Sequence, residues 1–324
     1  GHGGIGRMLH FTETFGLVSK STHLMPEFSS RTVAIMGLGL ISGSLARALK
    51  ASAWDGEIIA WGPREPSLKL GLELGAIDDY SLSLSDVVAR ADMIVVGAPP
   101  ASTGLILREI VDSLSDTKHA PVLTDLASIK GHVIDTMARD YAGFVPGHPI
   151  AGSEHSGVKY ADEGLFRGRE VILTPLETTD LAAVNEVEAM WQLTGAYLSQ
   201  MAVDQHDALL AASSHMPHMV SYALTRALEK DPSDPMTHGG GALRDMTRIA
   251  GSDPLMWTDI ALTNREALLL AIDAFEVEVA ALRQMVADKD GDLMNDYFSI
   301  CRRHRREHDH VLNPMTQNDT DSTG

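Results

Sequence analysis

The sequence predicts an α/β fold in which a doubly wound parallel sheet is followed by an all-helical domain. Two observations lead to this prediction. Short apolar runs alternate with helical stretches over residues 31–203, which is the pattern of repeated β-α-β units. Over residues 204–313 the apolar residues recur three and four positions apart, which is the spacing of amphipathic helices. We therefore expect two domains that meet near residue 203.

The apolar runs of the first domain are the expected strands, and the helical stretches between them are the expected crossovers. Consecutive β-α-β units of this kind cross over right-handedly and place all strands in one parallel sheet. The expected strands are residues 32–37, 57–61, 93–99, 120–128, 143–152, 169–175 and 196–202.

The helical domain carries more apolar surface than one small bundle would bury, so we expect it to form a homodimer. Residues 1–30 have no apolar core of a signal peptide and are expected to be a tag or flexible leader. Residues 314–324 are polar and turn-rich, and we expect a disordered tail there.

Charge and cysteine content restrict the partners. The 324 residues carry a formal charge of −18, which disfavours nucleic acid and anionic membranes as partners. An anionic substrate would then need a local group of cationic side chains. Cys301 is the single cysteine of the chain, which indicates a reducing compartment, the cytoplasm. No apolar run is long enough to form a membrane-spanning helix.

A glycine-rich turn follows the first expected strand, in the segment VAIMGLGLISGSLARALK (33–50). Gly37 and Gly39 occupy the first two positions of a dinucleotide-binding G-x-G-x-x-G turn, but Ser42 occupies the third. The order of strand, turn and helix favours a Rossmann-type cofactor site over a purely structural turn. Because the third glycine serves close packing, Ser42 should alter packing and not phosphate binding, and its hydroxyl could cap a free N–H.

The end of the second expected strand bears on the choice of cofactor. An NAD site places Asp or Glu there, to bind the ribose 2′-hydroxyl, but this chain has Gly62 followed by Arg64. A guanidinium suits a 2′-phosphate, so NADP is favoured, and the nearby Glu65 keeps NAD as the alternative. The predicted cofactor-binding residues are Gly37, Leu38, Gly39, Leu40, Ile41, Ser42, Gly62, Arg64, Ala98, Pro99, Asp125 and Ser128.

Three further stretches concentrate reactive side chains. TDLASIK (124–130) ends an expected strand, where doubly wound sheets bind their ligands. GHPIAGSEHSG (147–157) contains His148, a candidate proton acceptor. GGGALRDMTRIAGSDPLMWTDI (239–260) contains Arg248, whose guanidinium can bind a carboxylate bidentately.

In their order along the chain these motifs resemble the prephenate and arogenate dehydrogenases of tyrosine biosynthesis. GLGLISGSLA, DLASIK, GHPIAGSEHSG, SHMPH and RDMTRIAGSDPLMW carry the resemblance, which covers residues 31–310. It implies oxidative decarboxylation of prephenate to 4-hydroxyphenylpyruvate, or of arogenate to tyrosine, with hydride transfer to a nicotinamide. It also implies that tyrosine could inhibit, either in the active site or at the dimer interface.

The resemblance further implies roles for single residues. His148 would accept the proton of the substrate hydroxyl, and Ser128 would bind the same hydroxyl or orient His148. Arg248 would anchor a substrate carboxylate. The other predicted substrate-binding residues are His215, His218, Glu154, Ser153, Trp257 and Arg244.

Several of these assignments have structural alternatives. Trp257 could belong to the core, Glu154 could be a solvated acid, and Arg244 could pair with Asp245 or serve a partner subunit. Because an arogenate-only pocket should offer an acid to the substrate ammonium, the neutral Ser153 favours prephenate. The functional alternatives are an arogenate-specific dehydrogenase, a β-hydroxyacid-type dehydrogenase of the same architecture and a non-catalytic NADP-binding regulator.

No metal site is predicted. The histidines of SHMPH lie three apart on a helix without a third ligand at suitable spacing. The basic segment CRRHRREHDH (301–310) is interpreted as a solvated helix end.

Overall fold

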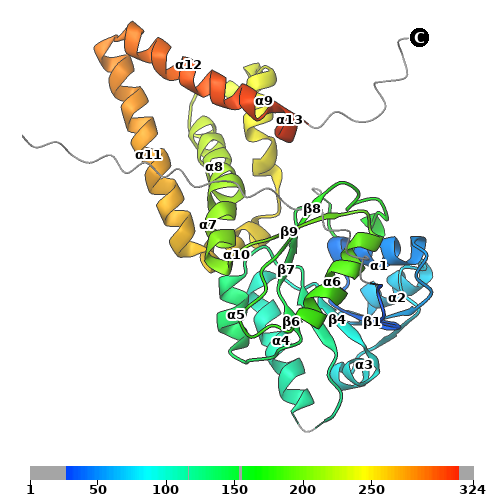
Figure 1. Cartoon of the computed structure of the whole chain (residues 1–324). Helices are drawn as coiled ribbons and strands as arrows, with labels where there is room; N and C mark the ends of the chain where they lie inside the picture. The colour runs from blue at the N-terminus through cyan, green and yellow to red at the C-terminus, as the bar shows by residue number, and fades with distance from the viewer. Residues whose placement is uncertain (1–26, 116, 153–154, 314–324) are drawn as a thin grey trace, which may run out of the picture.

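The computed structural model describes residues 27–115, 117–152 and 155–313 (Figure 1). Most of the expected leader and the whole expected tail therefore lie outside the described residues. The last residues of the expected leader are anchored, because the backbone and hydroxyl groups of Ser29 and Ser30 donate hydrogen bonds to the Glu186 carboxylate.

A six-stranded parallel sheet forms the centre of the first domain, in the strand order β3-β2-β1-β4-β5-β6. The order reverses between β1 and β4, so the carboxyl ends of these strands form the edge at which doubly wound sheets bind ligands. The strands are β1 (Thr32–Met36), β2 (Glu57–Trp61), β3 (Asp79–Ser81), β4 (Met93–Val96), β5 (Val122–Asp125) and β6 (Phe144–Val145).

Helices cover both faces of this sheet, and the strands supply each face alternately. Val33 and Ile35 of β1 belong to the core under α1 and α6, whereas Ala34 and Met36 belong to the core under α3, α4 and α5. The burial of both faces explains why the strands appear in the sequence as continuous apolar runs. The helices are α1 (Leu40–Ala51), α2 (Glu65–Glu73), α3 (Leu84–Arg90), α4 (Pro100–Leu114), α5 (Gly131–Met137) and α6 (Leu181–Leu193).

A second sheet corrects the expectation of one continuous parallel sheet. It consists of β7 (Gly147–Pro149), β8 (Glu170–Leu173) and β9 (Tyr197–Gln200), and β7 runs antiparallel to β8. The expected strand 143–152 is therefore wrong as a single element: the chain leaves the first sheet at Pro146, which has no N–H to donate to a strand ladder. The short β3 was missed because its residues, DYS, form no apolar run.

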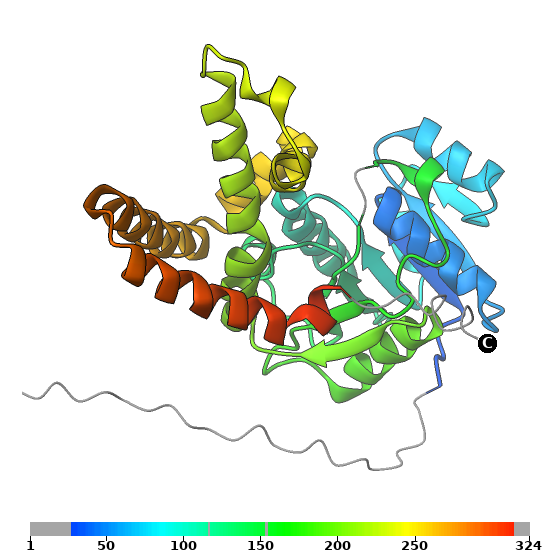
Figure 2. The same cartoon turned by 90° about the horizontal axis from the view of Figure 1, so that it is seen from above.

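The helical part begins with α7, three residues after β9 ends. Figure 1 shows α8 and α11 rising from the sheets and α12 crossing over their far end, and Figure 2 shows the same helices from above. None of the described helices is long and apolar enough to cross a membrane. The helices are α7 (Val203–Leu210), α8 (Met216–Glu229), α9 (Gly241–Thr247), α10 (Pro254–Thr263), α11 (Arg265–Asp288), α12 (Gly291–Glu307) and α13 (Asp309–Leu312). A π-helical turn at Ala211–His215 joins α7 to α8.

Candidate active site

The glycine-rich turn has the geometry that a bound pyrophosphate needs. Gly37 has a φ of +90°, in the region that favours glycine, and its N–H donates to the carbonyl oxygen of Trp61 at 2.7 Å. A Cβ on Gly37 would stand 3.0 Å from the carbonyl oxygen of Gly97, whereas a Cβ on Gly39 would meet no atom within 4 Å. Gly37 therefore makes the turn, and Gly39 leaves open space at the start of α1.

Ser42 stabilises this turn from behind. Its hydroxyl accepts a hydrogen bond from the N–H of Gly39 at 2.9 Å and donates one to the carbonyl oxygen of Gly37 at 2.7 Å. The expectation that Ser42 caps a free N–H is confirmed. The side chain is buried, so it shapes the turn and does not face a ligand. Space for it comes from Gly97, where a Cβ would lie 2.7 Å from the Cβ of Ser42.

The other predicted residues of the turn and its neighbourhood differ in exposure. Leu38 is buried and packs against α2, while Leu40 and Ile41 are half-buried. At the end of β4, the carbonyl groups of Ala98 and Pro99 accept hydrogen bonds from the Thr103 hydroxyl.

At the end of β2, Arg64 and Glu65 are the side chains that bear on the choice between NADP and NAD, and they differ in their interactions. Gly62 is buried beside Gly37, and Arg64 is exposed at the N-cap of α2. The Glu65 carboxylate accepts a hydrogen bond from the Tyr80 hydroxyl at 3.1 Å and pairs with Lys69 at 3.3 Å. Arg64 is thus the more available of the two side chains.

A fully buried ion pair lies at the carboxyl end of β5. The ammonium of Lys130 donates to the Asp125 carboxylate and to the carbonyl oxygen of Gly147. The second Asp125 oxygen accepts from the N–H of Gly147 at 3.2 Å. Because both side chains have no exposed area, the geometry does not support the expected contact of Asp125 with a cofactor. The pair instead fixes the residue that precedes His148.

His148 lies on β7 and forms a chain of hydrogen bonds into the helical domain. Its Nδ1 lies 2.9 Å from Nε2 of His206, and Nδ1 of His206 lies 2.8 Å from the Asp207 carboxylate. His206 has no exposed area and His148 is also buried. We refer to His148, His206 and Asp207 as the histidine relay.

The carboxylate at the end of the relay sets the tautomers of both rings. An ionised carboxylate only accepts, so Nδ1 of His206 carries the proton and its Nε2 accepts from Nδ1–H of His148. Nε2 of His148 is therefore the atom with a lone pair, and it has no partner in the described part of the chain. Burial is the main cause that lowers the pKa of His148 well below its ordinary value, and the electrostatic effects of His206, Lys130 and His215 act in the same direction. The ring is neutral and can accept a proton at Nε2.

Asp207 also connects the two domains. Its carboxylate accepts hydrogen bonds from the N–H groups of Lys130 and Gly131, at 2.9 and 2.8 Å, at the start of α5. Burial opposes ionisation of Asp207, but the hydrogen bonds from His206 and these two N–H groups outweigh it and lower its pKa. A single charged group thus holds the relay and the loop that carries Ser128.

Ser128 is half-buried on this loop and has no hydrogen-bond partner in the residues that the structure describes. His206 orients His148 through Nδ1, and the orienting role expected of Ser128 stays a prediction. Its expected contact with the substrate hydroxyl stays a prediction.

His215 is held neutral close by. Its Nδ1 accepts from the amide of Asn264 at 3.1 Å, and the same amide donates to the backbone oxygen of Asp207 at 2.9 Å. Burial, opposed by Asp207 and assisted by His206 and His218, lowers the pKa of His215 to about 4.

His218 and Trp257 form a stacked pair, with ring centroids 3.5 Å apart. Trp257 is buried against Ile129 of the loop after β5, and its indole N–H has no hydrogen-bond partner within the described residues. Burial lowers the pKa of His218, and the positive charge of Arg248 lowers it further. The charge of Arg248 therefore acts on the His218 ring.

The two predicted arginines lie at one surface pocket. Arg248 and Arg244 both line it, together with the glycines at 239 and 240. Arg244 is strongly exposed and forms the expected ion pair with Asp245, at 3.5 Å. Ser153 and Glu154 lie outside the described residues.

Sequence reasoning missed His206, Asp207, Lys130 and Asn264 as site residues. Lys130 was visible in the motif after β5, but its burial was not. His206 and Asp207 are adjacent in the sequence, just after the expected domain boundary. That position was the one feature of the sequence that could have indicated a role at the site between the domains.

The sequence matches two family models and several known proteins. Residues 45–200 match the family model described as prephenate dehydrogenase, nucleotide-binding domain. Residues 202–300 match the model described as prephenate dehydrogenase, dimerization domain. A cyclohexadienyl dehydrogenase of Zymomonas mobilis is 32% identical over 290 residues, covering 87% of this chain and 98% of the relative.

Two further relatives are similarly close. A prephenate dehydrogenase of Bacillus subtilis is 34% identical over 281 residues, which cover 85% of this chain and 75% of the relative. The crystal structure of prephenate dehydrogenase from Aquifex aeolicus, in complex with hydroxyphenyl propionate and NAD⁺, superposes with a TM-score of 0.78 at 33% identity. That comparison covers 86% of this chain and 98% of the other.

The lowered pKa of His215 predicts a stability that falls in acid. A histidine in the unfolded chain has a pKa of about 6.5. Between that pH and about 4, the unfolded state therefore binds more protons at His215 than the folded state does. Lowering the pH from about 7.5 to about 5 should reduce the free energy of unfolding by about 2 kcal/mol through His215 alone. His148 acts in the same direction.

Urea unfolding at a fixed protein concentration measures this effect. His215→Gln should show a smaller loss of stability over the same pH interval, whereas the control His238→Gln, at an exposed position, should behave like the wild type. An unchanged pH dependence in His215→Gln would show that His215 is not held neutral in the folded state.

Proposed function

Because this chain belongs to the prephenate dehydrogenase family, we propose that it catalyses the oxidative decarboxylation of prephenate to 4-hydroxyphenylpyruvate. One observation carries the proposal: the histidine relay leaves Nε2 of a neutral, buried His148 as the proton acceptor. The reaction needs an acceptor of this kind at the substrate hydroxyl.

The proposed chemistry assigns a task to each part of the relay. Prephenate is a cyclohexadiene with a 4-hydroxyl, a ring carboxylate and a pyruvyl side chain. As hydride leaves the carbon that bears the hydroxyl, Nε2 of His148 accepts the hydroxyl proton, which gives a ring ketone. Carbon dioxide then departs, the electron pair of the broken C–C bond makes the ring aromatic, and the oxygen takes the proton back from His148 to give the phenol. The imidazolium that forms is stabilised through His206 by the charge of Asp207, which stays ionised.

Arg248 is the proposed anchor for a substrate carboxylate. Its positive charge acts on His218 of the stacked pair, and a guanidinium binds carboxylates bidentately. It supplies the local positive charge that an anionic substrate needs in a chain of formal charge −18. Arg244, at the same pocket, would assist from a more exposed position.

The residues of the glycine-rich turn fit a nicotinamide dinucleotide. The positive φ of Gly37 and the open space beside Gly39 let a pyrophosphate approach the start of α1. When bound, the nicotinamide accepts the hydride. We favour NADP because Arg64 is exposed at the end of β2 and Glu65 is engaged by Tyr80 and Lys69. NAD is the alternative, and the Aquifex aeolicus structure contains NAD⁺.

The same site suggests a second substrate and an inhibitor. Arogenate would fit the same anchor and proton acceptor, so we include it as a second substrate. Tyrosine has the ring and the carboxylate of the products and is therefore the proposed inhibitor.

A homodimer is the proposed assembly. Leu268 is the one residue of α11 that is buried, and no residue of α12 is. Leu270, with 72% of its area exposed, and Val277, with 66%, lie seven residues apart on one face of α11. A second copy of the chain would cover this apolar face.

The first test follows reduced cofactor with prephenate and with arogenate, using each oxidised nicotinamide. Turnover with prephenate is expected in the wild type and should be lost in His148→Asn, while cofactor binding stays near normal. Asp207→Asn should lower kcat by about 100-fold or more, with a smaller change in KM, because the tautomer of His148 is no longer fixed.

The matched control is Asp204→Asn, which changes an exposed acid on the same helix and should leave kcat unchanged. Retained turnover in His148→Asn would refute the proposed function. Normal turnover in Asp207→Asn would refute the role of the relay alone.

A second test concerns the cofactor. Arg64→Ala should raise KM for NADP by about tenfold, because it removes a charged contact with the 2′-phosphate, and should leave KM for NAD unchanged. Arg31→Ala is the control, since Arg31 is an exposed arginine at the opposite end of β1. A wild-type enzyme with a clear preference for NAD would overturn the NADP assignment.

A third test concerns the assembly. Sedimentation at micromolar concentration should give a dimer for the wild type and a monomer for the double variant Leu270→Glu/Val277→Glu. Leu181→Glu introduces one such charge at a position that is 72% exposed on α6, and this variant should remain dimeric. A monomeric wild type would contradict the proposal.

A further inference from the structure

The end of α12 carries a group of metal-ligating side chains outside the active site. His304, Glu307 and His308 each offer one ligand atom, and these atoms all lie within 4.8 Å of one another. Histidines four apart on a helix share one face, and a residue three positions from the first lies beside them. We propose that this cluster, which we call the α12 site, binds one divalent transition ion of the zinc class.

One ring of the α12 site is already oriented as a metal ligand. Nδ1–H of His308 donates to the backbone oxygen of His304 at 2.9 Å, so its Nε2 carries the lone pair. Metal-bound histidines characteristically donate their second ring N–H to such a carbonyl group, which fixes the tautomer. The two rings are adjacent, with centroids 4.6 Å apart. In the described part of the chain, the Glu307 carboxylate has no hydrogen-bond or ion-pair partner.

The donor set selects the kind of ion. Two imidazoles and one carboxylate match the ligands that zinc takes in sites with three protein ligands and one water. Imidazole favours zinc, copper and nickel over magnesium or calcium, which prefer oxygen ligands. The site therefore suits a transition ion with one exchangeable position.

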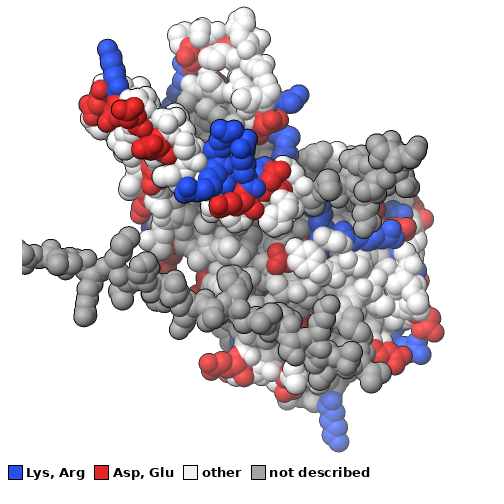
Figure 3. Space-filling model, turned by 45° about the horizontal axis from the view of Figure 1, so that its top comes forward, with Lys and Arg blue, Asp and Glu red and all other residues white. Residues whose placement is uncertain are grey.

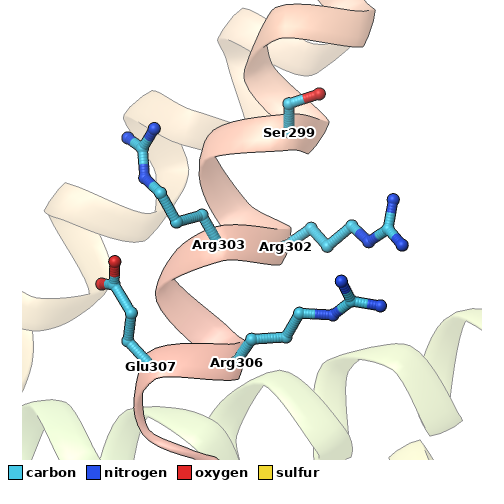
Figure 4. A pocket seen from close by; sticks show the side chains of 5 residues that line it. All are labelled: Ser299, Arg302, Arg303, Arg306 and Glu307. Carbon is cyan, nitrogen blue, oxygen red and sulfur yellow. The ribbon is translucent and has the colours of Figure 1, made fainter.

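The arginines of the same helix are placed unequally with respect to this ion. Figure 3 shows Lys and Arg side chains gathered on the helical part of the molecule, with Asp and Glu beside them. Figure 4 shows Arg302 and Arg306 directed to one side of α12, and Arg303 and Glu307 directed to the other. Arg305 is paired with Asp309.

The backbone adds a favourable field at this end of the helix. Glu307 is the last residue of α12 and His308 is its C-cap. The carbonyl groups at a helix C-terminus carry a partial negative charge, which stabilises a cation within the last turn. The side chains of the basic segment 301–310 are exposed, in agreement with the expected solvated helix end. Arg302 and Arg306 lie on one side of α12, whereas Arg303 lies on the side of Glu307.

Zinc titration of the full-length protein tests the proposal, with a chromophoric chelator as competitor and zinc as the only added metal. We expect one zinc ion per chain in the wild type. His304→Ala and His308→Ala should each weaken zinc binding by about tenfold or more, and Glu307→Gln should weaken it measurably. The control is His310→Ala, which removes an exposed histidine of α13 outside the cluster and should bind as the wild type does.

The outcomes are distinct from those for the catalytic proposal, because none of these residues belongs to the active site. Circular dichroism should show the same helix content in all four variants, so a loss of binding reports on ligands. A wild type that binds no zinc at micromolar concentration would overturn the site. Equal zinc affinity in His304→Ala, His308→Ala and the wild type would overturn it as well.

Discussion

The Asp207 carboxylate is the interaction on which the arrangement of the site depends. It belongs to the first helix of the second domain, yet it accepts two backbone N–H groups at the start of α5 and a ring N–H from His206. One carboxylate therefore fixes the position of a loop of the first domain and the tautomer of two histidines. Moving α7 relative to the sheets would release the two backbone N–H groups from Asp207 and would separate His206 from His148. Domain orientation and proton acceptance are consequences of one electrostatic contact.

The buried pair of Lys130 and Asp125 complements that contact from within the sheet. Two charges without exposed area are costly unless each finds several partners, and here both are satisfied by each other and by the backbone of Gly147. Removing either partner would leave an unpaired buried charge. The pair thus gives β7 a defined position against β5, although the two strands belong to different sheets. Because His148 directly follows Gly147, this position is also that of the proposed proton acceptor.

The sequence was sufficient for features that local patterns determine. The strands β1, β2, β4 and β5 are buried on both faces, and their apolar runs predicted them. The turn at Gly37 and Gly39 was likewise a local feature, as was the cap made by Ser42. The second sheet was not predictable in this way, because a break at Pro146 and a reversal at β7 leave no periodic signal. The partners of His148 were missed for a related reason: His206 is 58 residues away, and domain packing alone brings the two rings together.

Burial decides which of the basic side chains carry a positive charge. Desolvation disfavours a charged imidazole, so His148 and His215 are held neutral although a carboxylate lies nearby. A guanidinium keeps its charge, and Arg248 is exposed, so its charge costs little. In the proposed reaction, the permanent cation and the proton acceptor are therefore different kinds of side chain. If the histidines were exposed, they would compete as cations, and proton acceptance and carboxylate binding would no longer be separate tasks.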